Sequence, residues 1–351
     1  MMKRYLVLCS LAGMLCATSL ACADVFTAGG GRLTTLQNND GGWDWPLWDG
    51  NSVLSNTSHI LAPTAMGLVQ TYRVTGDPNY LAALKKAAGY LLKKAPVEIL
   101  FEDGYLAVAL DEVLGVTTYT EFVKKNLFDS LAKGTYDYLG TGGLNINTER
   151  YAQIIRLQRA GDRMPNLAAF DCGMALYVAH LVGADTGPWI AATKAEINEL
   201  SPKGVYDVLG LAGAILGLAS VGETVDPTAG VHEAAGSLAD LADILAGYQL
   251  ATGGFTWNAL SMDEGVGNEA VQETAFATLA LKEVNSSLYL NAITRAAAYL
   301  KASQLATGGW EDYVGQGEFN EVTGEALWTL GEAQQIQPKQ PDDNGLAAPM
   351  P

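Results

Sequence analysis

The sequence predicts an all-α protein, an α/α toroid in which about six helical hairpins form inner and outer rings of helices. Three observations carry this prediction: a Gly-Gly phrase that recurs along the chain, helix pairs between its copies, and an alternation of apolar with amphipathic helices. A fixed period is typical of a fold whose similar units stack on their neighbours.

The recurring phrase reads QNNDGGW at 37–43, QLATGGF at 249–255 and QLATGGW at 304–310, with a shorter echo, TGGL, at 141–144. Its glycines permit a tight turn, its aromatic residue can fill the gap between units, and its glutamine can bond exposed backbone at a helix end. We therefore interpret the phrase as scaffold. Stacking of its aromatic rings on a sugar or an isoprenoid is the functional alternative.

The clearest helix pair follows the first copy of the phrase. Apolar residues have helical spacing in Ala65–Tyr72 and again in Tyr80–Lys94. Gly76 ends the first helix, and Asp77 with Pro78 begins the second. Similar pairs are expected at 167–183 with 188–200 and at 270–285 with 288–304.

Two kinds of helix alternate between the phrases. LAVALDEVLG, AAFDCGMALYVAHLVG and LGLAGAILGLAS are apolar almost all round, which is typical of helices that are buried on most sides. YLAALKKAAGYLLKK carries lysines on one face and belongs outside. This alternation predicts an inner ring of buried helices wrapped by an outer ring.

The ends of the chain differ from the part between them. Residues 1–23 have the basic start, apolar run and small-residue cleavage site of a signal peptide, so we expect a periplasmic or secreted protein. The repeat domain is expected at 24–336, and a disordered, proline-rich tail at 337–351. A lipoprotein anchor at Cys22 is less favoured, because Ser19 stands where an aliphatic residue is usual.

Charge and cysteine content limit the classes of partner and the ways in which the fold can be stabilised. The formal net charge is −17, which disfavours nucleic acid and anionic membranes as partners. No transmembrane segment is expected in the mature chain. Cys172 is its one clear cysteine, so the fold depends on its core rather than on an intramolecular disulfide. A carbohydrate or another small ligand is the expected partner, and the sequence leaves the oligomeric state open.

A second periodicity appears when the units are aligned by their inner helices. In three units an asparagine precedes an acid by five residues, while the other units keep a polar residue at the first position alone. The pairs are Asn166 with Asp171, Asn268 with Glu273 and Asn320 with Glu325, and the single positions are His59, Asp103 and Asp207. In a toroid the inner helices begin on one side, so these residues are expected to form a ring around the mouth of a central cavity.

Such a ring suits three kinds of chemistry. It could hold sugars through hydrogen bonds, bind calcium through oxygen ligands, or supply a general acid and base. The catalytic candidates are Asp171, Glu273, Glu325 and His59, and the remaining ring residues are candidates for ligand binding. The alternative is ordinary helix capping, which repeats inherit together. The three acids interrupt apolar helices, where an unpaired charge is costly, and this favours a wet cavity.

Arg150 and Tyr151 are further candidates for ligand binding, because they follow a Gly-Gly phrase in NINTERYAQ. A lyase needs a cation to neutralise a uronate carboxylate, and Arg150 could fill that role. The alternative is a surface arginine at the start of a helix.

The Q-x-x-x-G-G-[WF] phrase before an apolar helix resembles the QW-type repeat of the terpenoid cyclase and protein prenyltransferase α/α toroids. The segment GLVQTYRVTGDPNYLAALKKAAGYLLK is similar to the helical repeat of pectate-lyase-type toroids. The resemblance implies the toroid fold over most of residues 30–335. It does not extend to the catalytic signatures, because a D-x-D-D run, a C-G-E-Q phrase and an N-D-N-A-M-like segment are missing. Zinc is not expected, since Asp171 and Cys172 are adjacent instead of spaced by one residue.

Three functional hypotheses follow. The first is an exported toroid that acts on a carbohydrate in an acidic central cavity, with lyase-like or hydrolase-like chemistry. The second is a non-catalytic toroid that binds a ligand or a protein. The third is a divergent terpenoid cyclase or prenyltransferase-like protein. No cofactor is expected, and calcium is the candidate ion.

Overall fold

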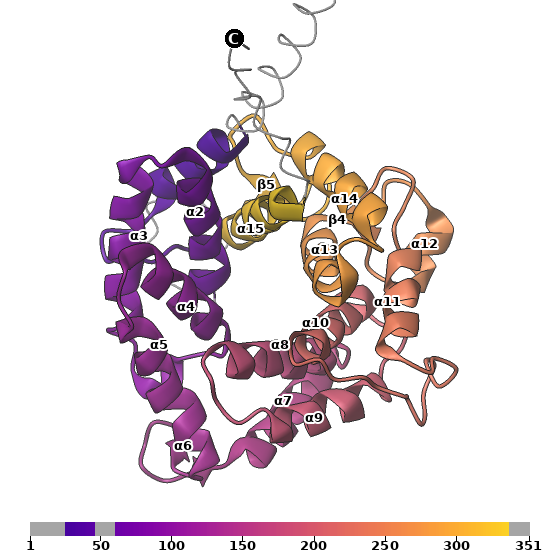
Figure 1. Cartoon of the computed structure of the whole chain (residues 1–351), viewed down its shortest axis with the longest axis horizontal. Coiled ribbons are helices and arrows are strands. Elements are labelled where there is room, and N and C mark those ends of the chain that lie inside the picture. Colours follow the sequence, from indigo (N-terminus) through magenta and orange to yellow (C-terminus); the bar gives the residue numbers. More distant parts are fainter. Residues whose placement is uncertain (1–24, 46–59, 337–351) are drawn as a thin grey trace, which may run out of the picture.

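The computed structural model describes residues 25–45 and 60–336, and its helices form two concentric rings (Figure 1). Each inner helix packs on the next, and the last packs on the first, so the inner ring closes. The inner ring consists of α2 (Leu61–Thr75), α4 (Glu102–Leu114), α8 (Leu167–Leu181), α10 (Asp207–Ser220), α13 (Val271–Asn285) and α15 (Asn320–Ile336). The all-α prediction is therefore confirmed.

The outer helices cover the inner ring from outside (Figure 1). They are the helix at 25–36, α3 (Pro78–Leu91), α5 (Thr118–Val123), α7 (Thr148–Gly161), α9 (Gly187–Ile197), α11 (Leu238–Gly247) and α14 (Leu290–Ala302). A π-helical turn (η3, Lys124–Phe128) joins α5 to α6 (Asp129–Ala132), and two short helices, η2 (Pro96–Glu98) and α12 (Ala259–Glu264), lie in connections.

The apolar inner helices pack closely because glycines face their neighbours. A Cβ atom added to Gly173 of α8 would lie 2.1 Å from the carbonyl oxygen of Gly213 in α10. One added to Gly67 of α2 would lie 2.7 Å from the Cα atom of Gly324 in α15. Any larger residue at these positions would push the helices apart. The glycines therefore set the distance between α8 and α10 and between α2 and α15.

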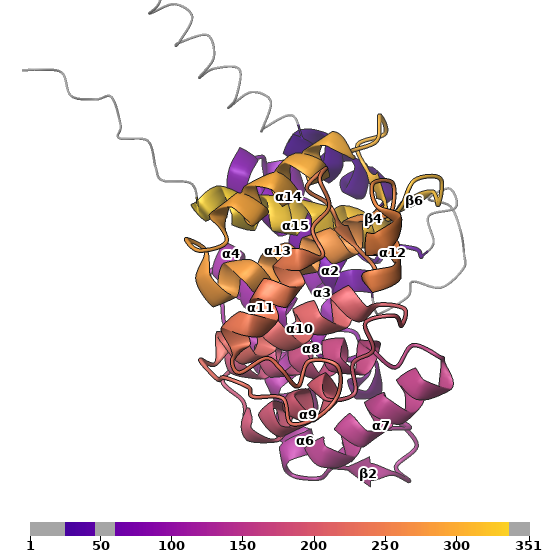
Figure 2. The same cartoon turned by 90° about the vertical axis from the view of Figure 1, so that its right-hand side faces the viewer.

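Three small antiparallel hairpins complete the fold. They are β1 (Tyr136–Asp137) with β2 (Asn145–Ile146), β3 (Phe255–Thr256) with β4 (Glu269–Ala270), and β5 (Trp310–Glu311) with β6 (Glu318–Phe319). Strands β2, β4 and β6 lie toward one side of the molecule in Figure 2. Since β4 runs directly into α13 and β6 into α15, the hairpins position the N-terminal ends of two inner helices.

The Gly-Gly phrases have a structural role. The side-chain amide of the glutamine donates to the glycine carbonyl of its own turn and to a carbonyl of a neighbouring outer helix: Gln249 bonds Gly253 at 2.9 Å and Ala292 at 2.8 Å. Gln304 does the same with Gly308 and Val25, as does Gln37 in the first copy. The phrase therefore ties each turn to the next unit.

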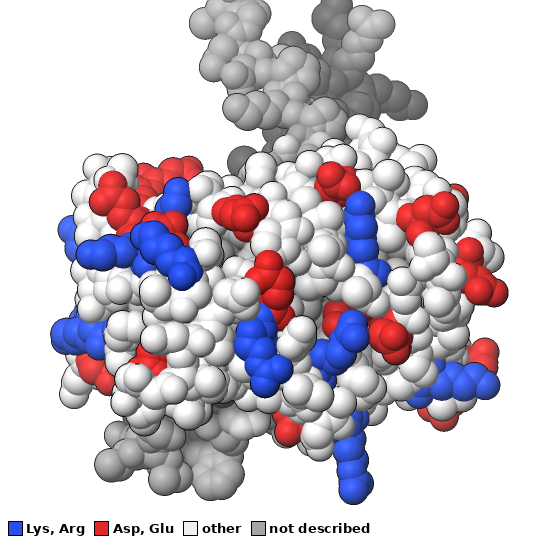
Figure 3. Space-filling view, turned by 90° about the horizontal axis from the view of Figure 1, so that it is seen from below, with Lys and Arg blue, Asp and Glu red and all other residues white. Residues whose placement is uncertain are grey.

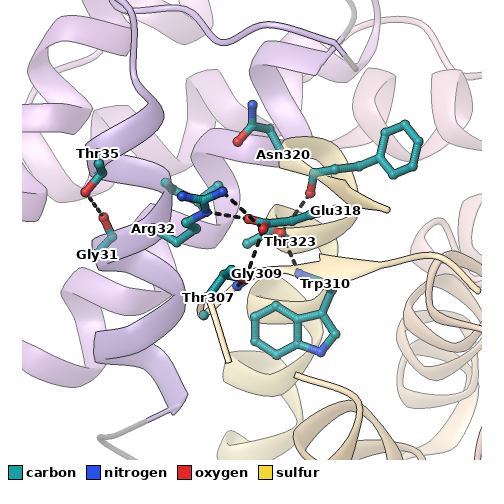
Figure 4. A network of polar contacts seen from close by, with 12 residues as sticks. Gly31, Arg32, Thr35, Thr307, Gly309, Trp310, Glu318, Asn320 and Thr323 are labelled. Atoms are coloured by element: carbon teal, nitrogen blue, oxygen red, sulfur yellow. Dashed lines mark hydrogen bonds and ion pairs between the residues drawn. The ribbon is translucent and has the colours of Figure 1, made fainter. Parts of the chain in front are cut away.

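The first outer helix closes the ring against the last hairpin (Figure 4). The guanidinium of Arg32 donates to both carboxylate oxygens of Glu318, at 2.6 and 3.2 Å, and the hydroxyl of Thr307 donates to the same carboxylate. Trp310 is fully buried nearby, and its backbone N–H donates to Thr323 at 2.9 Å. These contacts join the two ends of the repeat domain.

None of the helices in the described ranges is both long enough and apolar enough to cross a membrane. The expected signal peptide at 1–23 and the tail at 337–351 lie outside the described residues, so export and the domain limits stay predictions.

Candidate functional site

Four carboxyl groups gather where α13 and α15 begin. We call Glu273, Asp312, Glu321 and Glu325 the acid cluster. Asp312, which follows β5, accepts the backbone N–H of Gln272 at 2.9 Å, so the last hairpin bonds to the first turn of α13. The side-chain amide of Gln272 donates to both oxygens of Glu325, at 3.1 and 3.2 Å. These bonds link the two inner helices and the hairpin.

The acid cluster has a buried layer and an accessible layer. Glu273 and Glu325 are 1% and 2% exposed, and Oε2 of Glu273 is buried without a hydrogen-bond partner. Asp312 and Glu321 are half-buried. The two acids named from sequence therefore do not face open water, in contrast to the expectation of a wet cavity. The accessible acids are the other two.

Burial and mutual repulsion raise the pKa values of the acid cluster. Burial, followed by the charge of Asp312, raises the pKa of Glu273 well above its ordinary value. Burial and Glu321 do the same for the pKa of Glu325, while its bonds from Gln272 oppose the rise. Burial and Asp312 raise the pKa of Glu321 to about 7. A carboxyl group with such a pKa carries a proton near neutral pH and can donate it.

Three aromatic rings border the acid cluster. Tyr206, just before α10, stacks on Trp257 with a centroid distance of 6.4 Å and an interplanar angle of 15°. Trp257 contacts Tyr313 at 5.1 Å. Burial and the charges of Glu273 and Asp312 raise the pKa of Tyr206. Tyr313 directly follows Asp312 in the chain, so these rings adjoin the acid cluster.

A second group of rings lies between the inner helices. Tyr105 of α4 and Trp328 of α15 have centroids 4.7 Å apart, Trp328 contacts Phe276 of α13, and Phe276 contacts Phe170 of α8 at 4.8 Å. Four helices thus bring aromatic side chains together. Trp328 stands three residues after Glu325 on α15, so this group adjoins the acid cluster. Burial, Glu102, Glu325 and Glu321 raise the pKa of Tyr105.

Asp103 of α4 and Asp171 of α8 lie elsewhere and have basic partners. Asp171 accepts two hydrogen bonds from Arg159 of α7, at 2.5 and 3.0 Å. Asp103 accepts a bond of 2.6 Å from Lys94, and both side chains are almost fully buried. Glu102 has a buried oxygen without a partner, and burial with Asp171 raises the pKa of Glu102 to about 8.

The asparagines predicted for ligand binding are used in the scaffold. Asn166 donates to the carbonyls of Ser201 and Val205, Asn268 donates to Gly265, and Asn320 donates to Asp44. No hydrogen bond in the described part joins these asparagines to the acids five residues later. Simple Asn–acid capping therefore does not explain the repeated pattern, and the asparagines have other partners than expected.

The remaining candidates are dispersed. Asp207 is fully buried, accepts a bond of 2.7 Å from the hydroxyl of Tyr248, and has a pKa raised by burial to about 7. Arg150 is exposed on α7 and bonds Gln153, while Tyr151 is buried against the ring of Trp189. Asp207, Arg150 and Tyr151 are not members of the acid cluster. His59 is outside the described residues.

Sequence reasoning missed Asp312, Glu321 and Glu102. Glu321 stands one helical turn before Glu325, a spacing that places both on one helix face. This signal was available in the sequence. Asp312 belongs to the hairpin loop and carries no repeat signal, so only the folded structure brings it to α13.

The described residues include no group of three or more metal-binding side chains placed to hold an ion. Cys172 is buried, and burial raises the pKa of its thiol, so it has the surroundings of a core cysteine. A calcium site stays a prediction.

Comparison with known proteins gives the fold a context. No protein-family model matches the sequence, and no curated protein matches it. Among solved structures, a protein from Actinoplanes is similar with a TM-score of 0.55 and 20% identity, over 89% of this chain and 99% of that one. A type II terpene cyclase from Scytonema, MstE, solved with its substrate geranylgeranyl dihydroxybenzoate, is similar with a TM-score of 0.52 and 15% identity, over 91% and 99%.

These likenesses support a terpenoid cyclase-like fold. At this level of identity they bear on the fold alone. The QW-type repeat and the similarity to pectate-lyase-type toroids remain predictions from the sequence.

Proposed function

We propose that this protein hydrolyses a glycosidic bond in a glycan without carboxylate groups, by general acid and base catalysis at the acid cluster. The observation that carries the proposal is the gathering of four carboxyl groups from two inner helices and one hairpin. None of the ion pairs formed by the described residues involves these four side chains. Like charges at close range keep some of the group protonated, as acid catalysis requires.

The charge of the site selects the substrate class. A uronate would bring more negative charge to uncompensated carboxyl groups, and a lyase needs a cation to neutralise it. Arg150, the cation expected for that role, lies exposed on α7 with Gln153 as its partner. On the face shown in Figure 3, acidic and basic side chains are interspersed, so the net negative charge is not gathered there. A neutral or amino sugar is therefore favoured over a uronate.

The accessible acids have complementary roles. Glu321, with a pKa of about 7, is the proton donor to the leaving oxygen. The role of base or nucleophile is assigned to Asp312: burial raises its pKa, and the bond that it accepts from the backbone N–H of Gln272 opposes that rise and favours the carboxylate form. Glu273 and Glu325 lie too deep to touch a substrate and act as positioning residues that hold the protonation state of the cluster.

A reducing-end assay tests this function. Cellohexaose, xylohexaose, maltohexaose, a chitosan hexamer and polygalacturonate are incubated with the wild type and with Glu321→Gln between pH 4 and 8. We expect hydrolysis of at least one carboxylate-free hexamer, none of polygalacturonate, and a loss of about 10²-fold or more in kcat for Glu321→Gln. Glu283→Gln, at the exposed far end of α13, is the matched control. Equal turnover by Glu321→Gln and the wild type would overturn the proposal.

A second candidate is acid-initiated cyclisation of a polyprenyl substrate. It is favoured by the aromatic group of Tyr105, Phe276 and Trp328 beside the protonated acids, since such rings stabilise carbocations through their π faces. The similarity to the Scytonema cyclase agrees with it. Cyclic products from squalene or a geranylgeranyl compound, without glycan hydrolysis, would favour this candidate. Ligand binding without any turnover would favour a non-catalytic toroid.

A further inference from the structure

The Tyr206, Trp257 and Tyr313 rings come from three different connections. Tyr206 lies before α10, Trp257 between β3 and α12, and Tyr313 in the β5–β6 loop. Tyr206 and Trp257 are half-buried, and Tyr313 is 38% exposed. Rings that only fill a core are covered on both faces, whereas these keep accessible surface beside the acid cluster.

The backbone of Tyr206 is held in an unfavourable conformation. Its φ of 59° and ψ of 30° lie in the left-handed region, which a residue with a bulky side chain rarely adopts. Such a conformation is energetically unfavourable and persists only when the surroundings impose it. Strain of this kind concentrates at functional sites.

The surroundings of Tyr206 do impose it. Asn166, the residue directly before α8, accepts the N–H of Ser201 and donates to the carbonyls of Ser201 and Val205, which fixes both ends of the loop before Tyr206. Asn258 donates to the carbonyl of Gly204 at 3.1 Å. The amide of residue 208 donates to the carbonyl of Trp257 at 3.1 Å, so the two segments that carry the stacked rings are bonded to each other.

We propose that Tyr206, Trp257 and Tyr313 form a stacking platform for one pyranose ring, a subsite next to the acid cluster. The inference rests on the proposed function and names the subsite for that substrate. A pyranose presents an apolar C–H face to aromatic rings and hydroxyl groups at its edge. The adjoining carboxyl groups of Asp312 and Glu321 can accept hydrogen bonds from these hydroxyls, because both side chains are partly accessible.

The platform also explains why residue 166 is an asparagine. Its amide does not reach the acid cluster through any hydrogen bond of the described residues. It fixes instead the loop that presents Tyr206. Asn166 is therefore a positioning residue for the platform, which differs from the ligand-binding role expected from the sequence.

Calorimetric titration tests the platform separately from catalysis. The inactive Glu321→Gln protein is titrated with the four carboxylate-free hexamers, alone and combined with Tyr206→Gly, Tyr206→Phe or Tyr313→Ala. We expect Tyr206→Gly and Tyr313→Ala to weaken the Kd by about tenfold, the size of one aromatic contact, and Tyr206→Phe to retain it. Glycine accepts the left-handed conformation, and Tyr313 is exposed, so thermal unfolding checks that both variants stay folded.

The outcomes separate the two proposals. Equal Kd values for Tyr206→Gly, Tyr313→Ala and their parent would overturn the platform, even if the wild type hydrolyses a hexamer. Binding that depends on the rings would support the platform even if no hydrolysis is found, and the proposed function would then fail alone. Failure of all four hexamers to bind at about 1 mM would overturn the platform.

Discussion

The acids of α4 and α8 and the acids of α13 and α15 occupy comparable places near the start of inner helices, yet their surroundings differ. Asp103 and Asp171 each have a basic partner, Lys94 and Arg159. Glu273 has a buried oxygen without any partner, and Glu325 has an amide, Gln272. Asp103 and Asp171 are thus paired with bases on one side of the ring, where Glu102 keeps an oxygen without a partner, and four acids gather on the other side.

The difference originates outside the inner ring. Lys94 lies just after α3 and Arg159 lies on α7, so connections and outer helices supply the positive charges. At α13 and α15 the hairpins bring Asp312, a further acid, instead of a base. Repeated inner helices can thus carry the same type of residue while the connections decide whether it has a basic partner or lies among other acids.

Substitution of Lys94 should have the largest effect on stability, because it removes the partner of the buried Asp103. Lys94→Met leaves Asp103 buried without its cation, and breaking a buried pair in this way costs about 3–5 kcal/mol. We expect that loss in the free energy of unfolding, measured by urea denaturation at pH 7. Lys282→Met, which breaks the more accessible pair with Glu332, is the control and should cost about 1 kcal/mol or less. Equal losses would mean that burial does not distinguish the two pairs.

Arg159→Met should have a smaller effect. The Arg159 side chain is 34% exposed, so water can partly replace it beside Asp171, and we expect a loss of about 2 kcal/mol. Asp171→Asn combined with Arg159→Met should recover part of this loss, because the amide carries no charge. A double variant less stable than the single one would show that packing of the arginine, and not its charge, matters.

Two acids without a basic partner among the described residues, Glu321 of the acid cluster and Glu102 of α4, predict a pH dependence. The pKa of Glu321 is raised to about 7 and that of Glu102 to about 8, so between pH 4.5 and 8 the folded protein binds more protons than the unfolded chain. Stability is then fully present below about pH 4.5 and falls as pH rises through these values, by up to about 1.4 kcal/mol per pH unit for each proton.

Thermal unfolding between pH 5 and 8 measures this slope. Glu321→Gln removes one titrating group and should flatten the profile, whereas Glu283→Gln should leave it unchanged. A wild type that is more stable at pH 8 than at pH 5 would contradict the prediction, since it would mean that the carboxyl groups are stabilised in their charged form.

Gln272→Met should have the smallest effect. It removes two hydrogen bonds to Glu325, so we expect a loss of about 1 kcal/mol at pH 7, because hydrogen bonds to a partly protonated acid are of modest strength. Without these bonds the pKa of Glu325 should rise further. Carbonyl infrared spectroscopy of ¹³C-labelled glutamate can detect that change, and an unchanged protonated fraction would show that Gln272 does not act on Glu325.

Much of the fold could be predicted from the sequence. The helix pairs at 65–94, 167–200 and 270–304 correspond to α2 with α3, α8 with α9, and α13 with α14. These predictions succeeded because helical spacing and the Gly76 and Asp77 caps are local signals. The buried character of α4, α8 and α10 was also a local signal, since each of these helices is apolar almost all round.

The candidate site could be predicted from the sequence only in part. The sequence pointed to Glu273 and Glu325 because they interrupt apolar helices, and the structure places both in the acid cluster. It gave the same reason for Asp171, which has an arginine as its partner. Nothing in the sequence pattern distinguishes these cases, because Arg159 lies twelve residues away on another helix.

The sequence by itself determined the helices, their order and their burial, because spacing, capping and apolar content act between residues close in the chain. Only the tertiary structure decided which acids are compensated, that Asp312 joins α13, and that Tyr206 adopts a left-handed conformation beside Trp257. These features depend on contacts between segments far apart in the chain. The energies of charge and stacking depend on distance in space, which the order of residues does not specify.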